Sequence, residues 1–498
     1  MCCPPYRTRR FFVWALVAFA AFCADFRDTR AFAGENSEAN GPSAKSRPNI
    51  VFMLSDDQGW SGTSVRMHPD LATSRSDKLH TPNLERLAAR GMRFSEGYAP
   101  ACVCSPTRIA LQTGKNPARL HWTKAAPPEE GHKLVEPRLI KQIDEDERTI
   151  GEALHSVGYA TAHYGKWHIG GGGPGRHGYD EHDGDTGNEH AFQFQDPNPV
   201  DIFGMAERAE RFMRRNRDAG KPFFIQLSWN ALHAADNALR ATLSKYKRQA
   251  GVADNETADK RVAVAAITED LDTGVGLVLA AIDELGLADN TIVIYMSDNG
   301  AGGGGGQRGT LRGGKGGVWE GGVRVPFIVA GPGIAANSWC HVRVVGYDWF
   351  PTFCEWGGVP ASKLPKNLDG GSLAGLLSAE GRGTVIRPTG EIVFHFPHNQ
   401  SDDGPQSAVY DGDLKLIRFH EDDRLALFDL SHDPGEREDL AASRAADATR
   451  LNGRLDERLK QMDAQFATPN PDYDPARPPT PRKKDGGKNK PGKGRPPD

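Results

Sequence analysis

A cysteine stands at the start of a predicted helix, in the segment CSPTR at residues 104–108. Pro106 is typical of the first turn of a helix and Gly114 of the residue that follows one, so Cys104 should stand just ahead of a helix N-terminus. The free N–H groups and the positive dipole end there favour an anion, and Arg108 adds a fixed positive charge one turn further on. By itself, such a cysteine could be a low-pKa thiolate nucleophile of a phosphatase or a redox enzyme.

Oxygen-bearing side chains follow two predicted strands. The apolar run 50–54 leads to Asp56 and Asp57, and the run 291–296 leads to Asp298 and Asn299. Short continuous apolar runs indicate strands buried on both faces of a parallel sheet, and open α/β sheets bind their ligands at the carboxyl ends of such strands. The Asp pair alone would indicate a solvated turn. With the second pair, the four side chains predict a site for a hard cation such as Ca²⁺ or Mg²⁺ rather than for zinc.

The cysteine segment and its surroundings resemble the formylglycine-dependent sulfatases, an arylsulfatase-like family of the alkaline phosphatase superfamily. CSPTR fits the family pattern Cys-x-Pro-x-Arg, and LQTGKNP at residues 111–117 is similar to the rest of the signature. Four further blocks, which extend the resemblance over about residues 47–440, are NIVFMLSDDQGW at 49–60, GKWH at 165–168, SDNG at 297–300, and LRGGKG with EGGVRVPF at 311–327.

The resemblance implies the cofactors. A maturation enzyme would convert Cys104 into formylglycine (3-oxoalanine), and one calcium ion would be bound by Asp56, Asp57, Asp298, Asn299 and the modified Cys104. One hydroxyl of the aldehyde hydrate would attack sulfur and expel the alcohol. The other would then lose its proton, release sulfate and restore the aldehyde.

The same resemblance implies roles for the remaining site residues. Lys166 would bind sulfate, and His168 would be the base that helps to release it. His233, together with Lys315, would protonate the leaving alcohol. The match at His233 is weaker, because the family often has a proline shortly after this histidine and this chain has alanines there.

Two alternative functions remain open at this point. A phosphonate monoester or phosphodiester hydrolase could use the same aldehyde, because its substrates are also tetrahedral anions. A protein left unmodified at Cys104 could instead bind sulfated glycans without hydrolysing them. The glycine run 302–306 lacks the GK[ST] ending of a phosphate-binding loop, so we interpret it as an active-site rim. The expected substrate is a sulfated carbohydrate.

The elements that would position these residues predict an α/β fold. A helix should run from Pro82 to Gly91, a strand should lie within 221–229, and a long helix should cover 262–285. The resemblance implies an alkaline-phosphatase-like mixed sheet between helices, with a catalytic domain over residues 48–383. A subdomain over 384–475 should hold short antiparallel strands and a terminal helix, the strands being 392–396, 407–410, 414–419 and 425–430.

Composition and the chain ends bear on location. The 498 residues carry a formal net charge of only -4, and nothing in them indicates nucleic-acid binding. Arginines followed by the apolar run 11–22 predict a signal peptide over 1–33, then a flexible leader over 34–47, and therefore export to the periplasm or the extracellular space. An uncleaved signal anchor is the alternative, and no other stretch is apolar enough to span a membrane.

Two features leave their interpretation open. Cys340 and Cys354 could form a disulfide in an oxidising compartment or remain buried thiols. The tail 476–498 is rich in Lys, Arg, Pro and Gly, which predicts disorder. It is either a solvated tail or a segment that adheres loosely to polyanions.

Overall fold

The central sheet is mixed. The structure is a computed structural model that describes residues 47–233, 237–302, 307, 309–477 and 479. Within these residues, eight strands form one sheet in the order β10-β2-β9-β8-β1-β7-β5-β6, and only β9 runs antiparallel to its neighbours β2 and β8. The bounds are β1 Asn49–Ser55, β2 Gly91–Phe94, β5 Ala160–Gly165, β6 Glu181–His182, β7 Phe223–Ser228, β8 Thr291–Ser297, β9 Phe327–Ala330 and β10 Ser338–Cys340.

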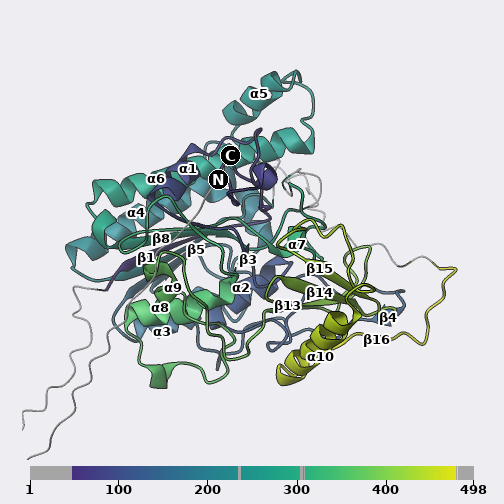
Figure 1. The fold of residues 1–498 in the computed structure, drawn as a ribbon. Coiled ribbons are helices and arrows are strands. Elements are labelled where there is room, and N and C mark those ends of the chain that lie inside the picture. Colours follow the sequence, from purple (N-terminus) through teal and green to yellow (C-terminus); the bar gives the residue numbers. More distant parts are fainter. Residues whose placement is uncertain (1–46, 234–236, 303–306, 308, 478, 480–498) are drawn as a thin grey trace, which may run out of the picture. The chain divides into compact units, whose positions relative to one another are not determined.

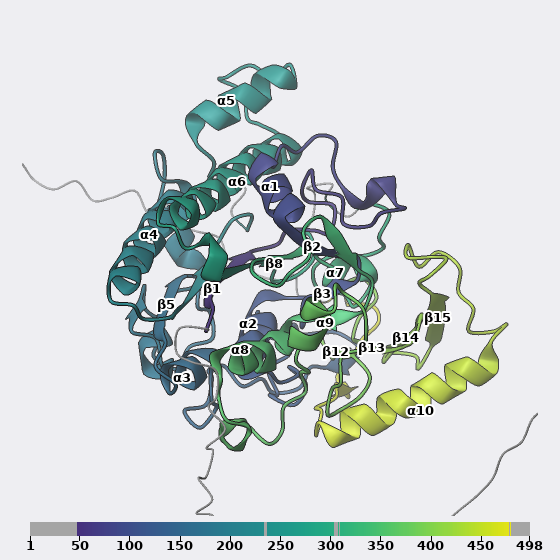
Figure 2. The ribbon, with the colours of Figure 1, turned by 60° about the vertical axis from the view of Figure 1, so that its left-hand side comes forward.

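Helices cover both faces of this sheet (Figures 1 and 2). In β1, Val51 and Met53 belong to the core beneath α1 (Pro82–Arg90), α4 (Ile202–Asp218) and α6 (Lys260–Glu284). Ile50, Phe52 and Leu54 point to the other face, beneath α2 (Cys104–Thr113), α3 (Ile150–His155), α8 (Trp349–Gly357) and α9 (Ala374–Ser378). Burial on both faces explains why β1 and β8 each contain a continuous apolar run. Outside these layers, α5 (Arg240–Gln249) packs on α6.

A second, antiparallel sheet follows in the chain. Among the described residues it has four strands, β12 (Val393–Phe396), β13 (Gln406–Asp411), β14 (Leu414–Phe419) and β15 (Leu425–Asp429). The helix α10 (Ala445–Gln461) packs on one face through its leucines, and the other face contacts the segment of α7 (Glu320–Val323). The predicted fold class is therefore confirmed.

Two short ladders tie distant segments together. β3 (Gly97–Tyr98) pairs with β11 (Val344–Val345), and β4 (Leu134–Val135) pairs with β16 (Thr468–Pro469). The four cysteines in the described part of the chain are free buried thiols, so Cys340 and Cys354 do not form a disulfide in this structure.

Several predictions lie wholly or mostly outside the described residues. These are the signal peptide 1–33, the leader 34–47 apart from Arg47, the glycine run at 303–306, and the tail 476–498 apart from three residues near its start. No helix in the described ranges is both long enough and apolar enough to cross a membrane.

Candidate active site

Backbone register brings the two predicted ligand pairs together. Ser55 at the end of β1 pairs with Ser297 at the end of β8, and the Asp298 N–H donates to the Ser55 carbonyl at 3.0 Å. The Asp57 N–H in turn donates to Asp298 Oδ1 at 3.2 Å. Asn299 Nδ2 donates to Asp57 Oδ1 at 2.8 Å. The four side chains therefore share one site, whose spacing is set by sheet hydrogen bonds.

Cys104 lies at this site as the first residue of α2. The sequence predicted it just ahead of the helix, and the difference of one position arises because Val103, in extended conformation, is the N-cap. Gly114 ends the helix with a φ of 69° and donates to the Ala110 carbonyl, as a C-terminal glycine does. Cys104 Sγ offers a ligand atom within 4.8 Å of oxygens of Asp56 and Asp57.

Burial disfavours a thiolate at this position. Cys104 is 2% exposed. Its burial raises the pKa of the thiol, and the nearby Lys166 and Lys315 only partly offset this. A neutral thiol is a poor nucleophile, so the environment does not support the phosphatase-like or redox role that the sequence left open.

Three cations balance the three carboxylates. Arg108 donates to Asp298 Oδ2 from Nη2 at 2.8 Å, and Lys315 Nζ lies 2.6 Å from Asp57 Oδ1 and 3.3 Å from Cys104 Sγ. Lys166 forms a buried ion pair with Asp56. Arg108 also donates from Nη1 to the Lys166 carbonyl at 2.6 Å, which links the cysteine helix to the GKWH turn.

These pairs set the charge states. Burial alone would raise the pKa of Asp56, but Lys166, His233 and Arg108 together hold it well below its usual range. Burial and the neighbouring Asp56 raise the pKa of Asp298 to about 6. Asp57 and Cys104 overcome the effect of burial on Lys315 and hold its pKa well above the ordinary lysine value. Lys315 therefore stays positively charged.

His168 is held in an unusual conformation. Its φ is 62°, in the left-handed region that residues other than glycine seldom adopt. Its Nδ1 is buried without a hydrogen-bond partner in the described part of the chain. Burial lowers the pKa of His168 well below its usual value, and Lys166 and Arg108 lower it further. The ring is therefore neutral at pH 7 and can accept a proton.

His233 reaches the same site from the segment after β7. Asp56 anchors that segment, because its N–H donates to the Ala231 carbonyl at 2.8 Å and its carbonyl accepts from Leu232 at 2.6 Å. His233 keeps an exposed side. Partial burial lowers the pKa of His233, and the positive charges of Lys166 and Lys315 lower it further. The negative charge of Asp56 opposes this shift. The residues predicted from the sequence are thus all near one another.

The sequence did not reveal the residues that support the GKWH turn. Thr186 Oγ1 donates to the Gly165 carbonyl at 2.5 Å and accepts from the Trp167 N–H at 3.0 Å, and its own carbonyl accepts from the His168 N–H at 2.8 Å. Asp183 Oδ2 accepts from the Gly165 N–H at 2.7 Å. A signal was present in the turn-forming run DGDTG at residues 183–187, but nothing local shows what such a turn contacts.

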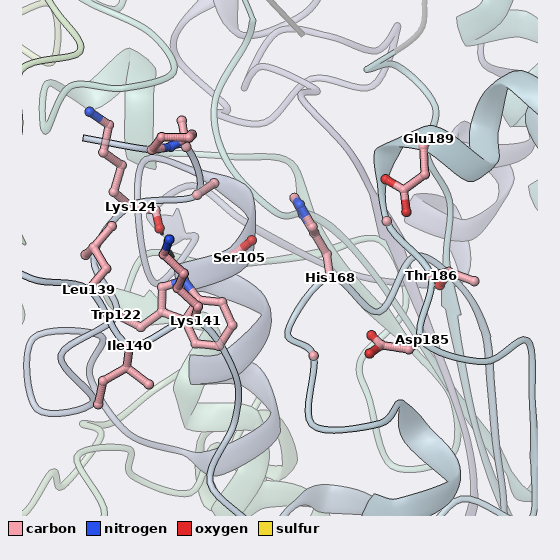
Figure 3. Close-up of a pocket in the computed structure, with 15 residues that line it drawn as sticks. Ser105, Trp122, Lys124, Leu139, Ile140, Lys141, His168, Asp185, Thr186 and Glu189 are labelled. Atoms are coloured by element: carbon pink, nitrogen blue, oxygen red, sulfur yellow. Dashed lines mark hydrogen bonds between the residues drawn. The ribbon is translucent and has the colours of Figure 1, made fainter. Parts of the chain in front are cut away.

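A cavity of about 370 Å³ opens beside His168. Figure 3 shows His168 between two walls. One wall carries Trp122, Lys124 and residues 139–141, and the other carries residues 185–189. Ser105, next to the cysteine, also lines the cavity, so it is continuous with the site.

A buried ionic network supports the first wall. Lys124 Nζ contacts both carboxylate oxygens of Glu136, at 2.7 and 3.0 Å, and His398 Nδ1 lies 2.8 Å from the same carboxylate. All three side chains are fully buried. His398 follows β12, so the smaller sheet helps to position a wall of the cavity.

Comparison with known proteins shows the family to which this chain belongs. Residues 48–359 match the family described as "Sulfatase", and residues 314–465 match "N-sulphoglucosamine sulphohydrolase, C-terminal". The first match covers more than half of the chain. The chain therefore belongs to the sulfatase family and is a sulfuric ester hydrolase, on an alkaline-phosphatase-like fold.

Relatives agree with this assignment, and a solved structure shares the fold. The chain is 29% identical to bovine (Bos taurus) arylsulfatase A over 81% of its own length and 85% of the relative. It is 30% identical to N-acetylgalactosamine-6-sulfatase of the dog (Canis lupus familiaris) over 65% of each chain. The crystal structure of Ps i-CgsB in complex with k-i-k-neocarrahexaose superposes with a TM-score of 0.66 at 23% identity, over 86% of this chain and 96% of that one.

Proposed function

We propose that this enzyme hydrolyses sulfate esters of carbohydrates with a formylglycine derived from Cys104 and one calcium ion bound by Asp56, Asp57, Asp298 and Asn299. One observation carries the proposal. The cysteine of the CSPTR segment, a thiol whose pKa is raised by burial, lies within 4.8 Å of strand-end carboxylates and 3.3 Å from Lys315 Nζ. The carbohydrate part rests on relatives such as the N-acetylgalactosamine-6-sulfatase.

The side chains fit a bound cation. Asp56 Oδ1 and Asn299 Oδ1 are buried and have no hydrogen-bond partner among the described residues. Buried oxygens without a partner are costly, and a hard cation would satisfy both. A calcium ion bound by these residues would withdraw charge from the sulfate oxygens. Because three cations already balance the three carboxylates, a site holding a divalent ion has a net positive charge that favours an anionic ester.

The position of residue 104 fits a modified side chain. A formylglycine there would supply an aldehyde hydrate, with one hydroxyl to attack sulfur and a second to release sulfate afterwards. The helix N-terminus of α2 favours the charge that develops beside it, and Lys315 binds the sulfate oxygens. Arg108 holds Asp298 and the Lys166 carbonyl in place.

Two histidines divide the proton transfers. His168, neutral at pH 7, takes the proton during release of sulfate. His233, whose side chain is exposed, donates a proton to the leaving oxygen, assisted by the positively charged Lys315.

Export of the enzyme is a further proposal, and it rests on the predicted signal peptide over residues 1–33. Processing of the N-terminus in the mature protein, read by N-terminal sequencing, tests it. A mature protein that begins at Met1 would contradict it.

Mass spectrometry of the peptide that contains residue 104 tests the mechanism. We expect an aldehyde there after co-expression with a maturation enzyme, and activity on 4-nitrophenyl sulfate in proportion to the modified fraction. Cys104→Ala should be inactive, whereas the matched control Cys102→Ala should keep both the aldehyde and the activity. Full activity with unmodified cysteine would overturn the proposal. Faster hydrolysis of a phosphonate monoester or phosphodiester than of any sulfate ester would instead favour the related hydrolases.

A further inference from the structure

The cavity beside His168 has an asymmetric charge distribution. Figure 3 shows Lys141 on one wall and Asp185 and Glu189 on the other, with His168 between them. Lys141, Asp185 and Glu189 are all exposed. Within the described residues, neither Lys141 nor Asp185 forms a side-chain hydrogen bond or ion pair, and Glu189 contacts only the neighbouring His190, at 3.3 Å.

The other charged groups of the cavity are already paired. Lys124 is fully buried, and Glu136 neutralises its ammonium. Asp183, behind the second wall, is paired with Arg208 at 2.8 Å. In the described part of the cavity wall, the charges left for a ligand are therefore one ammonium and two carboxylates on opposite sides.

The cavity adjoins the proposed reaction centre, so part of the sugar of a bound substrate can extend into it. Sulfate belongs at the cationic centre around Cys104, and Ser105 and His168 link that centre to the cavity. The volume of about 370 Å³ is within the range of small-molecule sites, roughly 300–1,000 Å³. Carboxylates accept hydrogen bonds from hydroxyl and amino groups and repel anions.

From this arrangement, and resting on the proposed function, we infer that Asp185 and Glu189 select a singly sulfated sugar. They bind hydroxyl or amino groups of the sugar and reject a second sulfate on that side. Lys141 donates a hydrogen bond from the opposite wall. The sulfate to be cleaved is thus attracted by one end of the site, while additional sulfates are disfavoured by the other.

Competition kinetics with a singly sulfated sugar and the corresponding disulfated sugar test this inference. We expect wild-type enzyme to prefer N-acetylgalactosamine 6-sulfate over the corresponding 4,6-disulfate in kcat/KM. The double variant Asp185→Asn, Glu189→Gln should reduce that preference by about tenfold, equivalent to about 1.4 kcal/mol. The variant Lys141→Glu adds a third carboxylate to the cavity. It should therefore increase the preference for the monosulfate, the opposite of the change expected in the double variant.

The control variant removes a charge elsewhere. Glu207 lies on α4 outside the cavity and its side chain is 70% exposed, so Glu207→Gln should leave the preference unchanged. An unchanged preference in both the double variant and Lys141→Glu would overturn the inference. Hydrolysis of 4-nitrophenyl sulfate without hydrolysis of any singly sulfated monosaccharide would also overturn it but leave the sulfatase function intact. Absence of hydrolysis of every sulfate ester by the modified wild-type enzyme would contradict the proposed function itself.

Discussion

At the scale of single residues, Asp298 connects the proposed cation site to the cysteine helix. Its carboxylate accepts hydrogen bonds from the Asp57 N–H and from Arg108. Arg108 also donates a hydrogen bond to the Lys166 carbonyl. The neighbouring Asp56 and Asp57 make a negative charge on Asp298 unfavourable. The positive charge of Arg108 stabilises the Asp298 carboxylate and so opposes this effect. A bound divalent cation would remove the remaining repulsion, so metal affinity should depend strongly on this residue.

We therefore predict that Asp298→Ala loses the bound metal and the activity together. The variant also leaves the buried Arg108 without its partner, and breaking a buried ion pair in this way costs roughly 3–5 kcal/mol. Elemental analysis and urea unfolding measure the two effects. The control Asp218→Ala removes an exposed carboxylate at the end of α4 and should change neither. Full metal occupancy in Asp298→Ala would refute the ligand assignment.

The division of labour between the histidines gives a second prediction. A sugar alkoxide is a strong base that needs a proton as it leaves, whereas 4-nitrophenolate does not. His233→Ala should therefore lower kcat/KM on a sugar sulfate by about 10²- to 10⁴-fold and on 4-nitrophenyl sulfate far less.

The matched variants separate the two roles. In His168→Ala, we expect release of sulfate from residue 104 to be the slow step, and this step is the same for every alcohol that has left. The kcat should therefore fall on both substrates, and a sulfated intermediate should accumulate. His155 is the last residue of α3 and its side chain is 53% exposed, so His155→Ala should be without effect. Equal losses on both substrates in His233→Ala would leave Lys315 as the better candidate for the acid.

At the scale of elements, the segment of Lys315 is fixed by the smaller sheet. Lys415 of β14 donates to the Val318 carbonyl at 2.8 Å and pairs with Glu320 at 3.0 Å and with Glu436 at 2.7 Å. Glu436 in turn accepts from the Glu320 N–H at 2.7 Å. These side chains are fully buried, so α7 and the chain just after Lys315 are attached to a sheet that carries none of the proposed catalytic residues.

Lys415→Met should therefore destabilise the enzyme by roughly 3–5 kcal/mol, because it leaves the buried Glu436 without its cation and Glu320 with Arg324 alone. Adding Glu436→Gln to this variant should recover most of the loss, since Glu320 still pairs with the buried Arg324 at 3.3 Å and no buried carboxylate of the network then lacks a cation. Urea unfolding measures these differences, and Lys363→Met, at an exposed position, is the control. Destabilisation of the double variant Lys415→Met, Glu436→Gln equal to that of Lys415→Met would show that the unpaired carboxylate is not the cause.

The comparison of sequence and structure also belongs to this scale. β1 and β8 were predictable because a strand buried on both faces must be apolar throughout, and their register then places Asp56 beside Asp298. Thr186 and His398 were not predictable, because each acts through partners far away in the chain. Local pattern specifies the element on which a residue lies, but not which loop that element will contact.

At the scale of the whole molecule, buried neutral histidines make stability depend on pH. In His395 of β12, Nδ1 lies 2.6 Å from Ser407 Oγ and Nε2 lies 2.7 Å from the Gln465 carbonyl oxygen. Burial lowers the pKa of His395 to about 3 and that of His163 in β5 to about 3. Between pH 6.5 and these values the unfolded chain binds protons that the folded chain does not, so stability falls as the pH falls.

His395→Gln should weaken this dependence. Each such histidine contributes up to about 1.4 kcal/mol per pH unit within its window, so the slope of unfolding free energy between pH 6 and pH 4.5 should decrease by at most that amount. Urea unfolding at several pH values measures the slope. The exposed His155→Gln should leave it almost unchanged, and an equal change in the two variants would contradict this origin of the acid sensitivity.

The cavity walls lie outside the regular elements that carry the ligand pairs. Trp122, residues 139–141 and residues 185–187 belong to connecting segments and Glu189 to a short 3-10 helix, whereas the carboxylates follow β1 and β8 in the middle of the sheet. Insertions and replacements in connecting segments disturb a hydrogen-bonded sheet little. Substrate preference can therefore diverge between homologous enzymes, or be exchanged by loop grafting in the laboratory, while the reaction centre is inherited unchanged.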